Sequence, residues 1–149
     1  MVDTSSILET WHRNFPRDVT PGLWARIEKL IDDGDLVAPE EVLVELSKKD
    51  DEINAWAKAR PQMFLPLDNL QVAQVKSIVN GFPNLLKKGR NSADAFVIAL
   101  AAVTGCIVIT EEAADGSLKK PKIPLICAAI DVRCTNVVGL MRREGWSLH

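Results

Sequence analysis

The sequence predicts an α/β protein with a central parallel sheet of about four to five short strands and helices on both faces. Short apolar runs alternate with segments of helical periodicity along the whole chain. Proline, glycine and capping residues separate these segments. The chain has 149 residues, of which 47% are hydrophobic. Because this is enough to bury one sizeable core, we expect a single domain spanning residues 1–149.

The central stretch of the prediction is residues 92–112, which reads as a helix, a tight turn and a buried strand. Ser92 is a suitable helix cap, and the residues from Phe96 to Ala102 are almost all apolar. Gly105 suits a left-handed helix end, and the run from Cys106 to Ile109 suits a strand. We therefore expect both elements to be buried on several sides.

The remaining elements follow from capping residues and apolar spacing. The other expected strands are Val2, Leu36–Ala38 and Val132–Thr135. The other expected helices begin near Ser5 or Ser6, Pro21, Pro39, Glu52, Asp68, Pro124 and Val137. Strands separated by helices favour parallel pairing, which places ligands beyond the carboxyl ends of the strands.

Acidic residues fall at these predicted strand ends or at the helix starts that face them. Asp3 follows the first strand, and Glu45 lies on the helix after the second. Asp94 opens the central helix, and Glu111 and Glu112 close the strand after it. Each residue taken alone could be an ordinary cap or an exposed carboxylate. Their coincidence at one edge of the sheet predicts a shared site.

Crowded carboxylates repel one another and are stabilised when cations lie among them. Mg²⁺ or Mn²⁺ suits such a site, because both ions prefer carboxylate and water oxygens. These ions can activate water and stabilise the transition state of phosphodiester hydrolysis. Zinc is disfavoured, since His12 and His149 are the only histidines and the three cysteines, Cys106, Cys127 and Cys134, are widely spaced.

The overall charge gives no general attraction to nucleic acid or membrane, because the formal net charge is only -2. Short basic patches occur at Lys87, Lys88 and Arg90, at Lys119, Lys120 and Lys122, and at Arg142 and Arg143. No signal sequence or apolar run long enough to span a bilayer is present in the sequence. We therefore expect a soluble, cytoplasmic protein without membrane association.

Several short motifs contain the acidic residues. They are Asp3-Thr4-Ser5 after the first strand, Glu45-Leu46, Asp94 within SADAFVIALA, and Thr110-Glu111-Glu112 after a VIT strand. Together these motifs resemble a PIN domain. The chain most closely resembles the PIN-like family DUF4411, through PEEVLVEL, EINAWAK and PKIPLICAAIDVRCTNV. The resemblance covers essentially the whole chain and implies a fold like that of VapC-type toxins, which are ribonucleases silenced by an antitoxin.

The resemblance also implies roles for individual residues. Asp3, Glu45, Asp94 and Glu112 would be metal ligands for Mg²⁺ or Mn²⁺, with Glu111 as an alternative to Glu112. Ser5 and Thr110 would support the site through hydroxyl hydrogen bonds. The sequence departs from the family pattern in having glutamate where aspartate is usual at the fourth acid, and in having only Val2 before Asp3.

The function implied is that of a metal-dependent endoribonuclease, a hydrolase that cleaves single-stranded RNA as the toxin of a toxin-antitoxin pair. Its partners would be RNA, a protein antitoxin and a second copy of the chain. The alternative is an inactive PIN-like module that binds RNA or protein. A receiver domain is disfavoured because Asp3 stands alone at the first strand, and a dinucleotide fold because no glycine-rich turn follows a strand.

Two loops and the tryptophans complete the expectations. The loops Leu85–Ser92 and Ala113–Lys122 flank the acidic edge, so their basic residues are candidates for holding RNA phosphates. Most tryptophans lie on apolar helical stripes and are interpreted as core or partner surface. Trp11 and Trp24, with Phe15-Pro16, are the candidates for a surface that contacts an antitoxin or a second copy.

Overall fold

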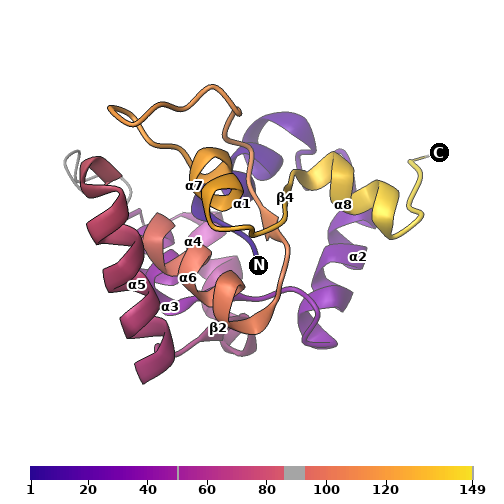
Figure 1. Ribbon diagram of the computed structural model, residues 1–149. Helices are drawn as coiled ribbons and strands as arrows, with labels where there is room; N and C mark the ends of the chain where they lie inside the picture. Colours follow the sequence, from indigo (N-terminus) through magenta and orange to yellow (C-terminus); the bar gives the residue numbers. More distant parts are fainter. Residues whose placement is uncertain (50, 86–92, 149) are drawn as a thin grey trace.

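The computed structural model describes residues 1–49, 51–85 and 93–148 and has a mixed α/β architecture (Figure 1). The described residues form eight α-helices: α1 (Thr4–Glu9), α2 (Pro21–Asp32), α3 (Glu40–Leu46), α4 (Glu52–Lys58), α5 (Asn69–Gly81), α6 (Asp94–Thr104), α7 (Ile123–Ala129) and α8 (Val137–Arg143). They also form a short π-helix, η1 (Thr10–Asn14), and two 3₁₀ turns, η2 (Pro61–Met63) and η3 (Pro83–Leu85). None of the helices among the described residues has the length and apolar character needed to cross a membrane.

In the described ranges the strands are only two residues long and form two small parallel sheets. β1 (Ala38–Pro39) pairs with β2 (Phe64–Leu65), and β3 (Val108–Ile109) pairs with β4 (Cys134–Thr135). The single central sheet of four to five strands expected from the sequence is therefore not observed. β2 was not predicted, because a two-residue apolar run has no periodicity and becomes a strand only through pairing with β1.

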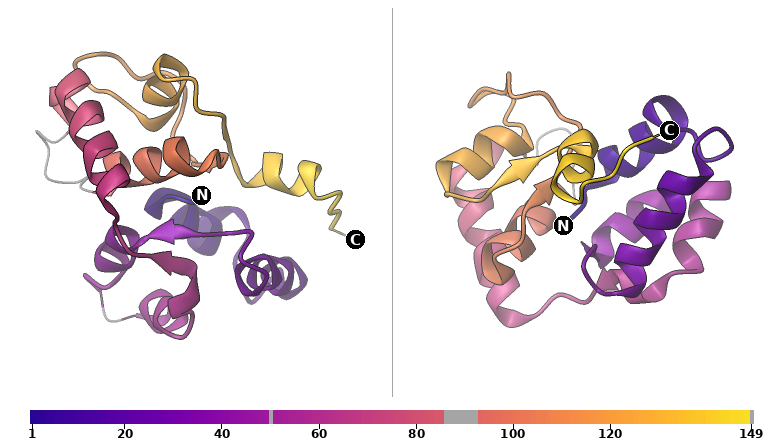
Figure 2. Two further views of the ribbon diagram at one scale, coloured as in Figure 1. Left: turned by 60° about the horizontal axis from the view of Figure 1, so that its bottom comes forward. Right: turned by 90° about the vertical axis from the view of Figure 1, so that its right-hand side faces the viewer.

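The first residues of the chain lie between the two sheets. Val2 forms an isolated parallel bridge with Ile109, and the Val2 amide donates a hydrogen bond to the Val37 carbonyl at 3.0 Å. The Asp3 amide donates to the Ile109 carbonyl at 3.1 Å. Figure 2 shows the N-terminus in the interior of the fold. The backbone of Asp3 is thus held by residues far away in the sequence.

The predicted helix, turn and strand at the centre of the sequence are confirmed. α6 is buried along most of its length and packs against α5 and α7. Gly105 ends it with a left-handed conformation, φ 73°, and β3 follows. Cys106 was expected to belong to the strand, but it precedes β3 and is half-buried. The expected cap, Ser92, lies outside the described residues.

The start of the first helix differs from its prediction. Asp3, and not Ser5 or Ser6, is the N-cap of α1, and its side chain accepts a hydrogen bond from the Ser6 amide. Aspartate and serine side chains both suit an N-cap, and the tertiary contacts of Asp3 decide that it takes this position. The predicted starts at Pro21 and Val137 agree with α2 and α8.

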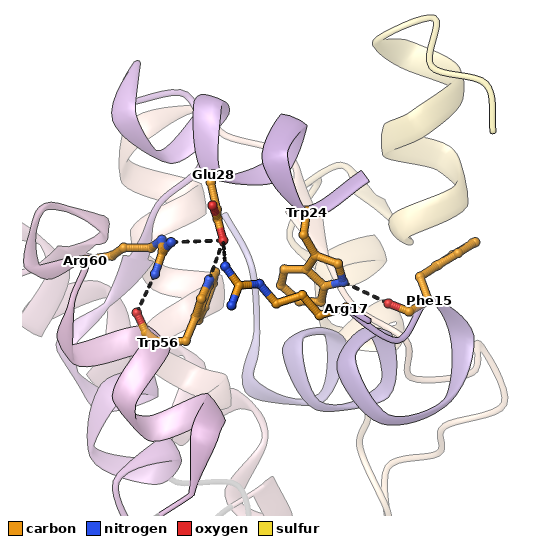
Figure 3. Close-up of polar contacts among 6 residues, drawn as sticks. All are labelled: Phe15, Arg17, Trp24, Glu28, Trp56 and Arg60. Atoms are coloured by element: carbon orange, nitrogen blue, oxygen red, sulfur yellow. Dashed lines mark hydrogen bonds and ion pairs between the residues drawn. The ribbon is translucent and has the colours of Figure 1, made fainter. Parts of the chain in front are cut away.

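Three tryptophans form a cluster that joins α2, α4 and η1. The ring centroids of Trp11 and Trp24 are 4.9 Å apart, and those of Trp24 and Trp56 are 5.5 Å apart, both with edge-on geometry. Trp24 is only 2% exposed and donates a hydrogen bond to the Phe15 carbonyl (Figure 3). Trp24 therefore belongs to the core, which corrects its interpretation as part of a partner surface.

Candidate functional site

The site begins at Asp3, whose carboxylate is buried and held by three donors. Asp3 Oδ1 accepts a hydrogen bond from the Ser6 amide at 2.7 Å. Asp3 Oδ2 accepts from the Ser5 hydroxyl at 2.8 Å and from Thr110 Oγ1 at 2.5 Å. Burial raises the pKa of Asp3 above its usual value, although these hydrogen bonds oppose the rise. Asp3 is therefore fixed in position.

Thr110 connects Asp3 to the segment after β3. Its side chain is buried, and Oγ1 accepts a hydrogen bond from the Glu112 amide at 3.1 Å while donating to Asp3. Ser6, which the sequence suggested only as a cap, adds a second link. Its hydroxyl donates to the Ile109 carbonyl at 3.0 Å. The hydroxyls of Thr110 and Ser6 thus hold the start of α1 against the end of β3.

The two adjacent glutamates point to different helices. Glu112 Oε2 accepts a hydrogen bond from the Ile123 amide, the first residue of α7, at 2.7 Å. Glu111 Oε1 accepts from the Val137 amide, the first residue of α8, at 2.9 Å. The charge of Glu112 acts on Asp94, and no comparable effect of Glu111 is found. Of the two candidates for the fourth acid, the structure therefore places Glu112 with the others.

Glu45 reaches the same region from α3. Its Oε1 accepts a hydrogen bond from the Ala93 amide at 3.1 Å, which fastens α3 to the start of α6. Its charge also acts on Asp94, the first residue of α6. Thus Glu45, like Asp3, Glu111 and Glu112, accepts a hydrogen bond from a backbone amide at or near the start of a helix.

Asp94 differs from the other four acids. It is 7% exposed, and its Oδ2 atom is buried without a hydrogen-bond partner among the described residues. Burial, followed by the charges of Glu112, Asp3 and Glu45, raises the pKa of Asp94 to about 8. Without a compensating cation, Asp94 therefore holds a proton at neutral pH.

We call Asp3, Glu45, Asp94 and Glu112 the acid cluster. Four carboxylates are a donor set suited to Mg²⁺ or Mn²⁺. The Oδ2 atom of Asp94, which has no hydrogen-bond donor among the described residues, is suited to bind such a cation. Among the described residues, however, no three His, Cys, Asp or Glu side chains are arranged so that they could hold a metal ion as they stand. Ion binding would therefore require the side chains that now cap helices to turn toward Asp94.

One of the two basic loops expected to flank the site is described in full. The segment from Ala113 to Lys122 begins directly after Glu112 and ends before Ile123, which holds Glu112. Lys119 and Lys120 are exposed, whereas Lys122 pairs with Asp115 at 2.5 Å. The other loop, Leu85–Ser92, lies outside the described residues apart from Leu85, and so do Lys87, Lys88 and Arg90.

The fold and the acid cluster define a mixed α/β protein in which the charges of carboxylates from distant parts of the chain act on Asp94. Over residues 1–148 the chain matches the family described as "Domain of unknown function (DUF4411)". The protein therefore belongs to the DUF4411 family. No match was found among curated proteins or among solved structures.

Proposed function

We propose that this protein is an Mg²⁺- or Mn²⁺-dependent endoribonuclease that cleaves single-stranded RNA, and that it is the toxin of a toxin-antitoxin pair. The proposal includes a PIN-like fold in which the strand segments belong to one parallel sheet. The hydrogen bonds of Val2 to Val37 and of Asp3 to Ile109 support this view, because they connect the two observed sheets through the first residues.

The observation that carries the proposal is the environment of Asp94. A buried carboxylate oxygen without a donor is costly unless it is protonated or paired with a cation. Three further carboxylates, Asp3, Glu45 and Glu112, act on Asp94 through their charges. A divalent cation bound at this position would offset the repulsion among these carboxylates. Cation binding would also release the proton of Asp94.

The chain's own residues would hold and orient the reacting groups. When bound, the cation would neutralise charge at the phosphate and lower the pKa of water. The residues that would hold it are Asp3, Glu45, Asp94 and Glu112. The hydroxyls of Ser5 and Thr110 would restrict the movement of the Asp3 carboxylate. The exposed Lys119 and Lys120 would hold RNA phosphates beside the cluster.

Cleavage of a labelled single-stranded RNA tests the proposal. Wild type and Asp94→Asn are compared with Mn²⁺ and with EDTA, and the substitution should lower the rate by on the order of 100-fold or more. Asp115→Asn is the matched control, because Asp115 is exposed and pairs only with Lys122 among the described ion pairs. Equal cleavage by wild type and Asp94→Asn would reject the role of Asp94 and indicate a contaminating nuclease.

A second candidate function is an inactive module that binds RNA or protein through the same face. It is favoured by the capping contacts of Asp3, Glu45 and Glu112, which occupy the acids with backbone donors. Calorimetric titration with Mn²⁺ separates the two functions. The nuclease should bind Mn²⁺ with an affinity reduced by Asp94→Asn, whereas the inactive module should bind none at millimolar concentration.

The toxin role rests on the resemblance to VapC-type toxins. Induced expression of wild type in a bacterial host should arrest growth, and Asp94→Asn expressed at the same level should not. If both proteins arrest growth, the toxicity does not depend on Asp94, and the toxin role of the acid cluster is rejected.

A further inference from the structure

A hollow of about 210 Å³ is lined by residues of α8, β3 and β4 and by neighbouring segments. Its floor is apolar, because Leu36, Ile109 and Leu140 line it and are between 5% and 9% exposed. Two exposed arginines also line it: Arg133 directly precedes β4, and Arg143 is the last residue of α8. None of the four acids of the acid cluster lines this hollow. It is therefore a separate place on the molecule, which the proposed chemistry does not use.

The two arginines of the hollow are available to a ligand. Among the ion pairs of the described residues, none involves Arg133 or Arg143, whereas Arg17 and Arg60 both pair with Glu28. A guanidinium without an ion partner can hold a phosphate by two parallel hydrogen bonds, and its plane can stack on a base. Both arginines are therefore suited to bind a nucleotide.

Two acids of the same hollow narrow the choice of ligand. Asp35 and Glu144 are exposed and line the hollow together with the arginines. They would repel an acidic protein segment, which offers only carboxylates to the arginines. A nucleotide uses every part of the lining, because its phosphate binds arginine, its base packs on the apolar floor, and base amino groups donate to carboxylates. The lining therefore favours a nucleotide over an acidic peptide.

The hollow adjoins the acid cluster along β4 and α8. Thr135 lines this hollow and also a second one, of about 280 Å³, whose lining includes Glu112. α8 leads from β4 away from α7 (Figure 1), with Val137 bound to Glu111 at its start and Arg143 at its end. Its 7 residues are roughly 10 Å long, about three times the rise of ~3.4 Å between nucleotides of one stacked strand. A strand bound at the acid cluster therefore reaches the hollow within a few nucleotides.

We propose that this hollow binds one nucleotide of a single-stranded RNA, a few nucleotides away from the bond that the acid cluster cleaves. Arg133 and Arg143 bind its phosphate, and its base lies on the apolar floor with its polar edge toward Asp35 or Glu144. The second half of this statement rests on the proposed function, whereas the nucleotide site itself does not. The hollow positions the strand and touches no reacting atom.

Cys106 provides a chemical probe of the hollow, because it lines the hollow and is half-buried. The Asp94→Asn chain, which should not cut the RNA, is treated with N-ethylmaleimide in Mn²⁺, and peptide mass spectrometry measures the alkylation rate of Cys106. A short single-stranded RNA of mixed sequence, at about ten times its Kd, should slow this rate by about tenfold, because only the free site reacts. Poly-glutamate at the same concentration should not protect. An unchanged rate with RNA bound would overturn the proposal, and equal protection by poly-glutamate would replace the nucleotide with an acidic protein segment.

Variants of the two arginines test the phosphate contacts without reference to Cys106. Fluorescence anisotropy of the labelled RNA gives its affinity at several salt concentrations, again in the Asp94→Asn chain. Arg133→Gln and Arg143→Gln should each weaken binding and reduce the slope of log affinity against log salt by about 0.7, the value for one phosphate of a single strand. Arg142→Gln is the matched control, since Arg142 is exposed but does not line the hollow. Equal slopes for all these proteins would overturn the proposal.

Cleavage by the wild type separates this inference from the proposed function. RNA cleavage without protection of Cys106 would keep the nuclease and reject the nucleotide site. Protection of Cys106 without cleavage would reject the nuclease and keep the nucleotide site. If both are observed, Arg143→Gln in the otherwise unchanged chain should raise KM and leave kcat unchanged, because it removes binding that substrate and transition state share. A fall in kcat at unchanged KM would overturn the positioning role of Arg143.

Discussion

Thr110 donates a hydrogen bond to Asp3 across 107 positions of the sequence, with 2.5 Å between Thr110 Oγ1 and Asp3 Oδ2. Both side chains are buried, and the same hydroxyl accepts from the Glu112 amide. One oxygen atom therefore fixes two members of the acid cluster. This contact also joins the start of the chain to the end of β3.

Removal of the Thr110 hydroxyl should destabilise the fold. Thr110→Val keeps the shape but removes one of the three donors of Asp3 and the acceptor of the Glu112 amide, so the free energy of unfolding should fall by about 1–3 kcal/mol. Urea unfolding measures this loss. The control is Thr104→Val at the exposed end of α6, and a loss no larger than the control's would contradict the role of Thr110.

The two neighbouring glutamates should behave differently. Glu112→Gln removes one charge from the acid cluster and should weaken Mn²⁺ binding and RNA cleavage by about tenfold or more. Glu111→Gln changes a contact with the start of α8 and should leave both nearly unchanged. Titration calorimetry and cleavage assays of the two variants form a matched pair. The reverse order would place Glu111 in the site.

The metal-free protein should lose stability as the pH rises. The pKa of Asp94 is raised to about 8 in the folded state from 3.8, so its contribution is fully present below about pH 4 and is lost as the pH rises through 8. Asp94→Asn removes this dependence. Between pH 4 and pH 8, its free energy of unfolding should therefore rise relative to that of wild type by on the order of 2–5 kcal/mol. Urea unfolding in EDTA at several pH values measures it, and parallel profiles for the two proteins would contradict the raised pKa.

The carboxylate of Glu28 should be important for the tryptophan cluster. Its Oε1 accepts hydrogen bonds at 2.9 Å from Trp56 and Arg17, and Arg60 pairs with it at the same distance (Figure 3). Glu28→Gln should lower the free energy of unfolding by about 1–3 kcal/mol, because these donors lose a charged acceptor. Glu144→Gln is the exposed control, and equal unfolding midpoints would show that the Glu28 charge is dispensable.

The helices could be predicted because their signals are local. Pro21 at a first helical position, Asp68 with Gln71 as a capping box, and Gly105 in a left-handed conformation each act within a few residues. The strands could not be predicted to the residue. A strand of two residues has no apolar period, and its existence depends on a partner segment far away in the sequence.

The sequence by itself determined which residues are acidic, which helices carry them and that several lie near strand ends. The tertiary structure decided how they are used, because hydrogen bonds between distant segments orient each carboxylate. The Ile123 amide binds Glu112 at the start of α7, and the Val137 amide binds Glu111 at the start of α8. Burial then leaves one oxygen of Asp94 without a donor from the part of the chain that the structure describes. That imbalance depends on the packing of the whole chain, and no local pattern of residues encodes it.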